Sequence, residues 1–152
     1  MFQRIIVPLD GSSLSEQSLE KAKGLSTAMH APLVVLRVVD TASITRLASV
    51  GTGAGMDYSM VGEVLDEERQ DSKDYLEGIV ARLKADGFDV TGEVKQGPIA
   101  STIVDSATPD DVIVIASHGR TGVQRWFLGS VAEDVVRRAN CPVLLIREKP
   151  EE

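Results

Sequence analysis

The chain has 152 residues, a formal net charge of −7 and a hydrophobic content of 43%. That length suits one domain with a core of its own, and the composition is typical of a folded chain rather than a disordered one. The acidic balance argues against nucleic acid or an anionic membrane as the main partner, because both attract basic surfaces and the largest basic cluster is Arg137-Arg138.

The first part of the chain predicts a strand, a helix and a second strand. Ile5 to Val7 is a short apolar run that ends at Pro8-Leu9-Asp10-Gly11-Ser12. We expect a helix to begin at Ser13, where Glu16 three residues later completes a capping box. The run from Leu33 to Val39, broken only by Arg37, suits a strand covered on both faces. In the helix that begins at Ser13, apolar residues recur at helical spacing and should face the sheet: Leu19, Ala22, Leu25 and Met29.

The middle of the chain predicts a long helix, an edge strand and a short helix. Apolar residues recur along one side from about Met60 to Ala85, and Gly87 follows as a C-cap. Asp89 to Gln96 is a more polar strand, as is common at a sheet edge. Gly97-Pro98 then opens a short helix whose inner face is Ile99, Ile103 and Ala107.

The last part predicts a strand, a helix and a strand. Val112 to Ile115 is the most apolar strand and should be central, and Gly129-Ser130 opens the last helix. Pro142 to Ile146 forms the final strand. The stripe that should face the sheet from the last helix is Val131, Val135 and Ala139.

Strict alternation of strands and helices predicts an α/β fold with a parallel sheet, right-handed crossovers and helices on both faces. We expect one doubly wound, Rossmann-like domain over residues 1–152, with five strands in the order 3-2-1-4-5. Thr41 to Ser59 does not fit the alternation, and with its three glycines it is expected to be a functional flap or a mobile loop.

Two loops should carry the chemistry. In a doubly wound sheet, ligands bind beyond the carboxyl ends of the strands where the strand order reverses. That rule selects Pro8-Leu9-Asp10-Gly11-Ser12 after the first strand and Ala116-Ser117-His118-Gly119-Arg120 after the fourth.

The loop after the fourth strand has the features of a polyphosphate cradle. Nine residues separate Gly119 from Gly129, and Ser130 opens the next helix. Gly119 allows close approach of a ligand because it lacks a Cβ. Gly129, Ser130 and Val131 present backbone amides at a helix N-terminus, where the helix dipole also favours an anion.

These motifs closely resemble those of the universal stress proteins. ATP-binding members of that family carry Gly-x-x-Gly, nine residues, then Gly-Ser or Gly-Thr. This chain has Ala116-Ser117-His118-Gly119, nine residues, then Gly129-Ser130. The stretch Pro8 to Ser12 resembles the family's N-terminal signature, and Asn140 to Leu145 resembles its closing segment.

The resemblance implies an adenine nucleotide hydrolase-like fold and an ATP-binding, regulatory role in the stress response, with ATP carried together with Mg²⁺. Asp10 and Val38 would lie near the adenine, residues 116 to 119 would line the ribose and phosphates, and Gly129, Ser130 and Val131 would hold the phosphates. Pro8, Leu9 and Arg120 are further candidates for the nucleotide site, although Arg120 can equally be a solvated loop residue. Ala116 replaces the first motif glycine, and its methyl group is expected to weaken ATP binding. The resemblance also implies a homodimer formed through residues 142–147 and a further protein partner.

Other functions stay open. A slow ATPase or an ATP pyrophosphatase is one, but there is no Walker sequence and no pyrophosphatase loop, and Asp10 is the only credible base near the site. Turnover is therefore not the expected role. A dimeric scaffold that binds no ATP, or that binds a cyclic nucleotide, is another, and Ala116 supports it. A flavodoxin-like electron carrier needs aromatic residues on the switch-point loops, and this chain does not place them there.

Several site residues also have simpler interpretations. Asp10 can be a turn residue, and Gly129-Ser130 can be turn and capping residues. His118 has no evident nucleophile or orienting carboxylate beside it in the sequence, so its ring is expected to pack on the loop.

One cysteine, Cys141, excludes an internal disulfide and a cysteine metal cluster. The N-terminal residues lack the architecture of a signal peptide, and no apolar run reaches the roughly 20 residues that span a bilayer. We therefore expect a cytoplasmic protein without membrane insertion.

Overall fold

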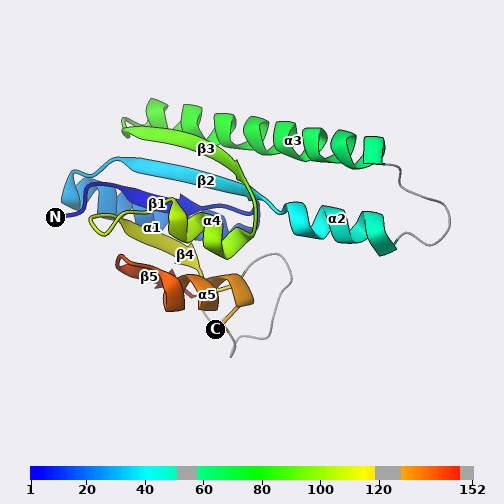
Figure 1. The fold of residues 1–152 in the computed structure, drawn as a ribbon. Coiled ribbons are helices and arrows are strands. Elements are labelled where there is room, and N and C mark those ends of the chain that lie inside the picture. The colour runs from blue at the N-terminus through cyan, green and yellow to red at the C-terminus, as the bar shows by residue number, and fades with distance from the viewer. Residues whose placement is uncertain (51–57, 119–127, 148–152) are drawn as a thin grey trace, which may run out of the picture.

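The computed structural model describes residues 1–50, 58–118 and 128–147, without the side chains of 47–50 and 58–59. Strands and helices alternate along the chain, with two helices in succession after the second strand (Figure 1). The elements are β1 (Ile5–Pro8), α1 (Ser13–Met29), β2 (Leu33–Val39), α2 (Thr41–Val50), α3 (Tyr58–Ala85), β3 (Val90–Gln96), α4 (Ile99–Asp105), β4 (Val112–Ala116), α5 (Ser130–Arg138) and β5 (Val143–Ile146).

The five strands form one parallel sheet in the order β3-β2-β1-β4-β5, which confirms the predicted topology. β1 lies in the middle, β4 is an interior strand buried at every residue, and β3 is the edge strand that its polar sequence predicted. The strand order reverses between β1 and β4, so the loops that follow these two strands lie at the switch point.

The core has two halves, one on each face of the sheet. On the face of α1 and α3, Val112 and Val114 of β4 join residues of both helices. On the face of α4 and α5, Ile113 and Ile115 do the same. The alternation follows from the twofold side-chain period of a strand, and it explains why an interior strand is apolar at every position. None of the helices described is both long enough and apolar enough to cross a membrane.

The structure corrects the expectation that residues 41–59 form only a flap or a loop. Residues 41–50 form α2, and the Asp40 carboxylate accepts hydrogen bonds from the backbone N–H groups of Ala42 (3.1 Å) and Ser43 (3.3 Å). An aspartate that binds these first amides is a helix N-cap. α2 and the first turns of α3 extend past the strands (Figure 1). Residues 51–57, which include the three glycines of this stretch, lie outside the described residues.

α1 begins at Ser13, as predicted, but its cap differs by one residue from the predicted one. Ser12, not Ser13, is the N-cap, and its hydroxyl oxygen accepts a hydrogen bond from the Ser15 N–H at 3.2 Å. Glu16 stays in the first turn of the helix, but the Ser13–Glu16 capping box is wrong. Gly11 has a φ of 85°, a left-handed conformation that glycine adopts without strain, and this turn brings the chain from β1 into α1.

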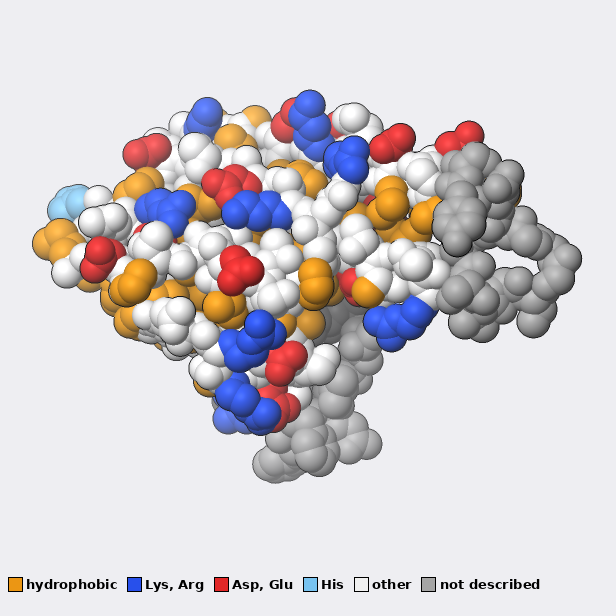
Figure 2. Space-filling model, in the orientation of Figure 1, with side chains coloured by type: hydrophobic (Ala, Val, Ile, Leu, Met, Phe, Trp, Pro, Cys, Tyr) orange, Lys and Arg blue, Asp and Glu red, His pale blue; other side chains and the backbone are white. Residues whose placement is uncertain are grey.

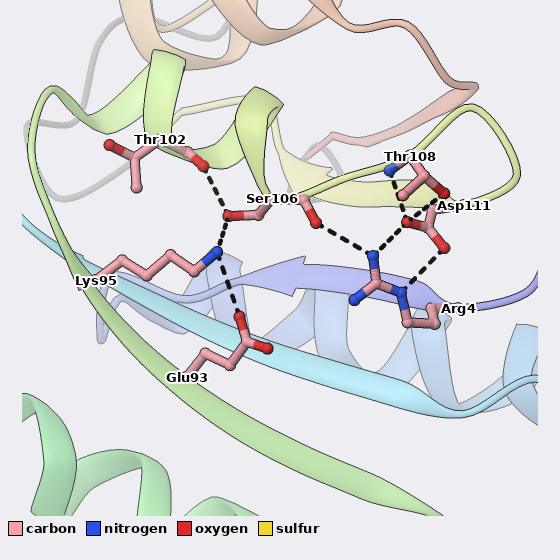
Figure 3. A network of polar contacts seen from close by, with 7 residues as sticks. All are labelled: Arg4, Glu93, Lys95, Thr102, Ser106, Thr108 and Asp111. Carbon is pink, nitrogen blue, oxygen red and sulfur yellow. Dashed lines mark hydrogen bonds and ion pairs between the residues drawn. The ribbon is translucent and has the colours of Figure 1, made fainter.

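A polar network joins the amino ends of β1 and β4 to the end of α4 and to Lys95 of β3 (Figure 3). The Arg4 guanidinium donates to both carboxylate oxygens of Asp111, at 2.7 and 3.2 Å, and to the Ser106 carbonyl. The Asp111 side chain is fully buried, and it also accepts from the N–H and the hydroxyl of Thr108. Lys95 of β3 adds a hydrogen bond to the Ser106 hydroxyl. The network therefore ties the starts of β1 and β4 to the end of α4.

Candidate functional site

The candidate site lies at the carboxyl ends of the strands, on the side of the sheet toward α2 (Figure 1). The end of β1 is held to the end of β2, because Pro8 stands beside Leu36 in the register and the Leu9 N–H donates to the Leu36 carbonyl at 2.8 Å. β4 is the other neighbour of β1. The two predicted loops therefore leave adjacent strands, which places Pro8, Leu9 and Asp10 near the end of β4.

Asp10 is half-buried and carries a charge. Its Oδ1 accepts a hydrogen bond from the Ser12 N–H at 2.8 Å, which closes a turn of the Asx type. Burial raises the pKa of the Asp10 carboxyl, but hydrogen bonds from Ser12 and Ser15 and the charge of Arg37 outweigh burial, so the pKa lies below its usual value. Asp10 is therefore a carboxylate at neutral pH and acts as a hydrogen-bond acceptor, in addition to shaping the turn.

The end of β4 and the start of α5 are joined at Gly129. The Gly129 N–H donates to the Ser117 carbonyl at 2.7 Å, and the Ser117 N–H donates to the Ile146 carbonyl of β5 at 2.8 Å. A Cβ on Gly129 would stand 3.1 Å from the His118 Cα and 3.2 Å from the Ser117 oxygen. This second glycine of the predicted motif is needed for close approach of two backbone segments, and Ser117 itself is buried.

α5 presents a helix N-terminus at this junction. Gly129 is its N-cap and has no side chain with which to cap the helix. The first N–H groups of a helix have no partners within the helix, and the helix dipole adds positive potential there. The amides of Ser130 and Val131 thus form a place where an anionic oxygen can bind, and the Ser130 side chain is exposed.

A groove of ≈ 250 Å³ runs beside this helix start. Among the predicted residues, Ser130 and Val131 line it. Sequence reasoning missed the rest of its lining, which comes from the start of α4, from the start of α2 and from the outer side of α5. These additional residues are Asp40, Ala42, Arg46, Pro98, Ile99, Ala100, Ser101, Asp134 and Arg138. The Gly97-Pro98 turn was the available signal, because it places the start of α4 at the same edge of the sheet as the start of α5.

Of the remaining predicted residues, three lie among the described residues and two do not. Val38, near the end of β2, is half-buried and packs against the core on the α4 and α5 face. Ala116 is buried at the end of β4, and His118 is half-buried. Gly119 and Arg120 lie outside the described residues.

A larger groove, of ≈ 550 Å³, lies between α3 and β3. Its lining comes from those two elements alone and includes no helix start. We therefore place the candidate site at the helix start that lines the smaller groove, together with the β1 and β4 ends, which contribute no lining residue to that groove.

On the face shown in Figure 2, basic and acidic side chains stand beside each other rather than in a patch of one sign. Among the described residues, no three His, Cys, Asp or Glu side chains are grouped so that they could hold a metal ion.

Comparison with known proteins agrees with this architecture. The model of the universal stress protein family matches residues 1–147. The chain belongs to the universal stress protein family. It is 30% identical to universal stress protein MJ0531 of Methanocaldococcus jannaschii over all of this chain and 86% of that protein. It is also 30% identical to universal stress protein MJ0577 of the same organism, over 98% of this chain and 97% of that one.

Solved structures of universal stress proteins share the fold. The structure of MJ0577 superposes with a TM-score of 0.83 at 27% identity and covers 99% of both chains. UspA of Lactobacillus plantarum gives a TM-score of 0.76 at 25% identity, over 96% of this chain and 98% of that one. A universal stress protein in complex with cAMP and one from Archaeoglobus fulgidus in complex with dAMP are 21% and 22% identical, each with a TM-score of 0.60. These last two show a common fold.

Proposed function

We propose that this universal stress protein binds ATP at the β1–β4 switch point and acts as a regulatory protein through its nucleotide state. The observation that carries the proposal is the junction at Gly129. There the end of β4 lies so close to the start of α5 that a Cβ would crowd it, and no side chain caps the helix. An anion-binding helix start beside a buried strand end is the arrangement that phosphate groups use in nucleotide-binding α/β domains.

In this proposal the adenine lies near Asp10 and Val38. The Asp10 carboxylate accepts a hydrogen bond from an amino group, which adenine carries at its C6 position and guanine replaces by a carbonyl oxygen. A carboxylate facing that carbonyl oxygen is repelled. Asp10 would therefore favour adenine over guanine nucleotides.

The phosphates would lie at the amides of Ser130 and Val131, beside Gly129, whose own N–H donates to the Ser117 carbonyl. Mg²⁺ would enter on the phosphate oxygens, because hard oxygen ligands suit that ion and the described residues supply no cluster that could hold it alone. The ribose and the first phosphate would pass residues 116–120. Two proteins with this fold hold an adenine nucleotide, cAMP in one case and dAMP in the other, so a cyclic nucleotide remains the alternative ligand.

The test is a calorimetric titration with ATP, GTP and cAMP, with and without Mg²⁺, of the wild-type protein, Ser130→Glu and Ser130→Gln. A glutamate in the first turn interacts favourably with the helix dipole, so Ser130→Glu should fold. Its carboxylate, however, repels phosphate. We expect ATP binding to the wild type and to Ser130→Gln, and at least about a tenfold loss in Ser130→Glu, since a like charge at contact distance costs a kcal/mol or more.

A wild-type protein that binds none of the three nucleotides would refute the proposal. Tighter binding of cAMP than of ATP would assign the pocket to cyclic nucleotides instead.

We also propose that the protein is a homodimer paired through residues 142–147. β5 is an edge strand, because it pairs with β4 on one side only among the described strands. Its Leu144 side chain is 42% exposed, and Val136 of the neighbouring helix α5 is 49% exposed. An apolar edge strand is a template for pairing, and pairing with a second copy would cover it.

A further inference from the structure

Arg37 is the one charged residue in the otherwise apolar β2. Its neighbours Leu33 and Val35 belong to the core on the α1 and α3 face, so the side-chain period of the strand puts Arg37 on that face as well. It is half-buried, and its Nη1 donates a hydrogen bond of 3.2 Å to the Leu9 carbonyl. A charged donor inside β2 therefore reaches the residue that precedes Asp10.

The guanidinium also lies over an aromatic ring. Its Cζ is 5.7 Å from the centre of the Tyr75 ring on α3. The Tyr75 hydroxyl donates to Oε1 of Glu16 on α1 at 3.2 Å. Burial and the nearby Glu16 carboxylate raise the pKa of Tyr75 to about 12, so the ring stays neutral and keeps the electron-rich face that attracts a cation. Arg37 thus lies over a ring of α3 that is itself held to α1.

The backbone of Leu9 is held from β2 by both of its polar groups. Its N–H donates to the Leu36 carbonyl at 2.8 Å, and its carbonyl accepts from Arg37. One residue later, the Asp10 carboxylate is held by the Ser12 N–H. The peptide between Leu9 and Asp10 therefore has little freedom to turn.

We propose that Arg37 is a positioning residue for nucleotide recognition, which holds the Leu9–Asp10 peptide so that the Asp10 carboxylate meets the amino edge of adenine. The inference rests on the proposed function, since it names how that site recognises the base. Arg37 acts through Leu9 and through its charge, which is one of the groups that keep Asp10 ionised. It touches no ligand in this role.

The test compares Arg37→Met, Arg37→Lys and Lys23→Met with the wild type. Lys23 is a matched control, because its Nζ lies 5.8 Å from the Phe88 ring centre and so also forms a cation–ring contact, while its hydrogen bonds go to Glu20 in its own helix. Each variant is titrated with ATP and GTP by calorimetry. Without nucleotide, the Asp10 carboxyl carbon is titrated by NMR.

Removal of a charged hydrogen bond should weaken ATP binding about tenfold in Arg37→Met, with a smaller loss in Arg37→Lys, which keeps the charge and a donor. The ratio of ATP to GTP affinity should fall in the same order, because a loose Asp10 discriminates less. In the absence of nucleotide, the pKa of Asp10 should rise in Arg37→Met and recover in part in Arg37→Lys. Lys23→Met should match the wild type in all three measurements.

Two outcomes separate this inference from the proposed function. If the wild type binds no nucleotide, the proposed function fails, and the titration without nucleotide still decides whether Arg37 fixes Asp10. If ATP binds but Arg37→Met keeps the wild-type affinity ratio and the wild-type Asp10 titration, the inference is overturned, whatever happens to the melting temperature. Should Arg37→Met fail to fold, Arg37→Lys and Arg37→Gln carry the same comparison.

Discussion

The Cα of His118 lies 3.1 Å from the point that a Cβ on Gly129 would occupy. A contact this short is tighter than nine in ten Cβ contacts in folded proteins, so a side chain at residue 129 would require the neighbouring backbone to shift by a few tenths of an ångström. The Gly129 N–H to Ser117 carbonyl bond, at 2.7 Å, holds them together. The geometry of the candidate phosphate site therefore depends on one missing methyl group.

Gly129→Ala should loosen this junction. Because the crowded neighbours are backbone atoms, they cannot move aside as a flexible side chain would, and we expect a loss of about 1–2 kcal/mol in unfolding free energy. ATP affinity should fall about tenfold if the β4 end shifts. Urea denaturation and calorimetry measure the two effects.

Gly78→Ala is the control for that substitution. Gly78 lies in the middle of α3 and has open space where a Cβ would stand, so alanine there should stabilise the protein by about 0.5–1 kcal/mol and leave ATP affinity unchanged. Equal effects of the two substitutions would contradict the role of Gly129.

Ala116→Gly tests the departure from the family motif. The sequence suggests that the Ala116 methyl group crowds the ribose. In the structure Ala116 is only 8% exposed, and strand alternation puts it on the face of Val112 and Val114, opposite to the face of α5. We therefore expect the glycine variant to change ATP affinity by less than about threefold and to lose up to about 1 kcal/mol of stability, because glycine weakens a strand. A much larger gain in affinity, by calorimetry, would restore the crowding interpretation.

Asp111→Asn should destabilise the fold by about 2 kcal/mol at neutral pH, since it removes a charged acceptor from a buried site while the partly exposed Arg4 can still be hydrated. Burial raises the pKa of Asp111, but the bonds from Arg4 and Thr108 outweigh it, and the pKa is lowered. A lowered folded-state pKa means that the stabilisation is complete above the unfolded value of about 3.9 and is lost as the pH falls through the folded one. The difference between wild type and variant should shrink accordingly below about pH 4.

Asp66→Asn is the matched control for the ion pair. Asp66 meets Arg69 at 3.3 Å, but the two side chains are 76% and 51% exposed. Exposed pairs contribute little, so the change should stay below about 0.5 kcal/mol. Thermal or urea unfolding measures these stabilities. A stability difference between wild type and Asp111→Asn that does not change with pH would contradict the role given to the Asp111 carboxylate.

Leu144→Lys tests the proposed dimer. A lysine on an exposed strand edge opposes pairing with a second strand, so the variant should be monomeric at concentrations where the wild type is dimeric. Analytical ultracentrifugation gives the masses. Met60→Lys, which changes a hydrophobic residue of similar exposure (48%) on α3, should leave the dimer intact. A wild type that sediments as a monomer would rule out this interface.

Asp10→Asn probes the recognition of adenine. The pKa of Asp10 is lowered, so the wild-type carboxylate is charged throughout the range of pH 5–8, which lies above its usual value of about 3.9, and its contribution to ATP affinity should stay constant there. The asparagine variant keeps the shape and loses the charge, and the preference for ATP over GTP should fall about tenfold. Competition titrations at several pH values measure it, and an unchanged preference would remove Asp10 from base recognition.

Local patterns in the chain are enough to predict the layered architecture. Runs such as Leu33 to Val39 are too continuously apolar for a half-exposed strand, and their alternation with helical patterns leaves a parallel sheet covered on both faces as the solution. The spacing of Gly129-Ser130 behind the fourth strand marked the same helix start that the structure places at the switch point. These features depend on local periodicity and on residue type, which a sequence contains.

Which groups meet across the fold could be learned only from the packed chain. The sequence did not predict α2, because its cap, Asp40, directly follows a strand. The three glycines after α2 also made the whole segment resemble a loop. Arg37 looked like an interruption in a strand, and its meaning depends on Leu9 and Tyr75, which are far from it in the sequence. The groove beside α5 is formed by residues at the starts of α2, α4 and α5, which are far apart in the sequence. Such contacts depend on how the elements pack, and local periodicity does not predict them.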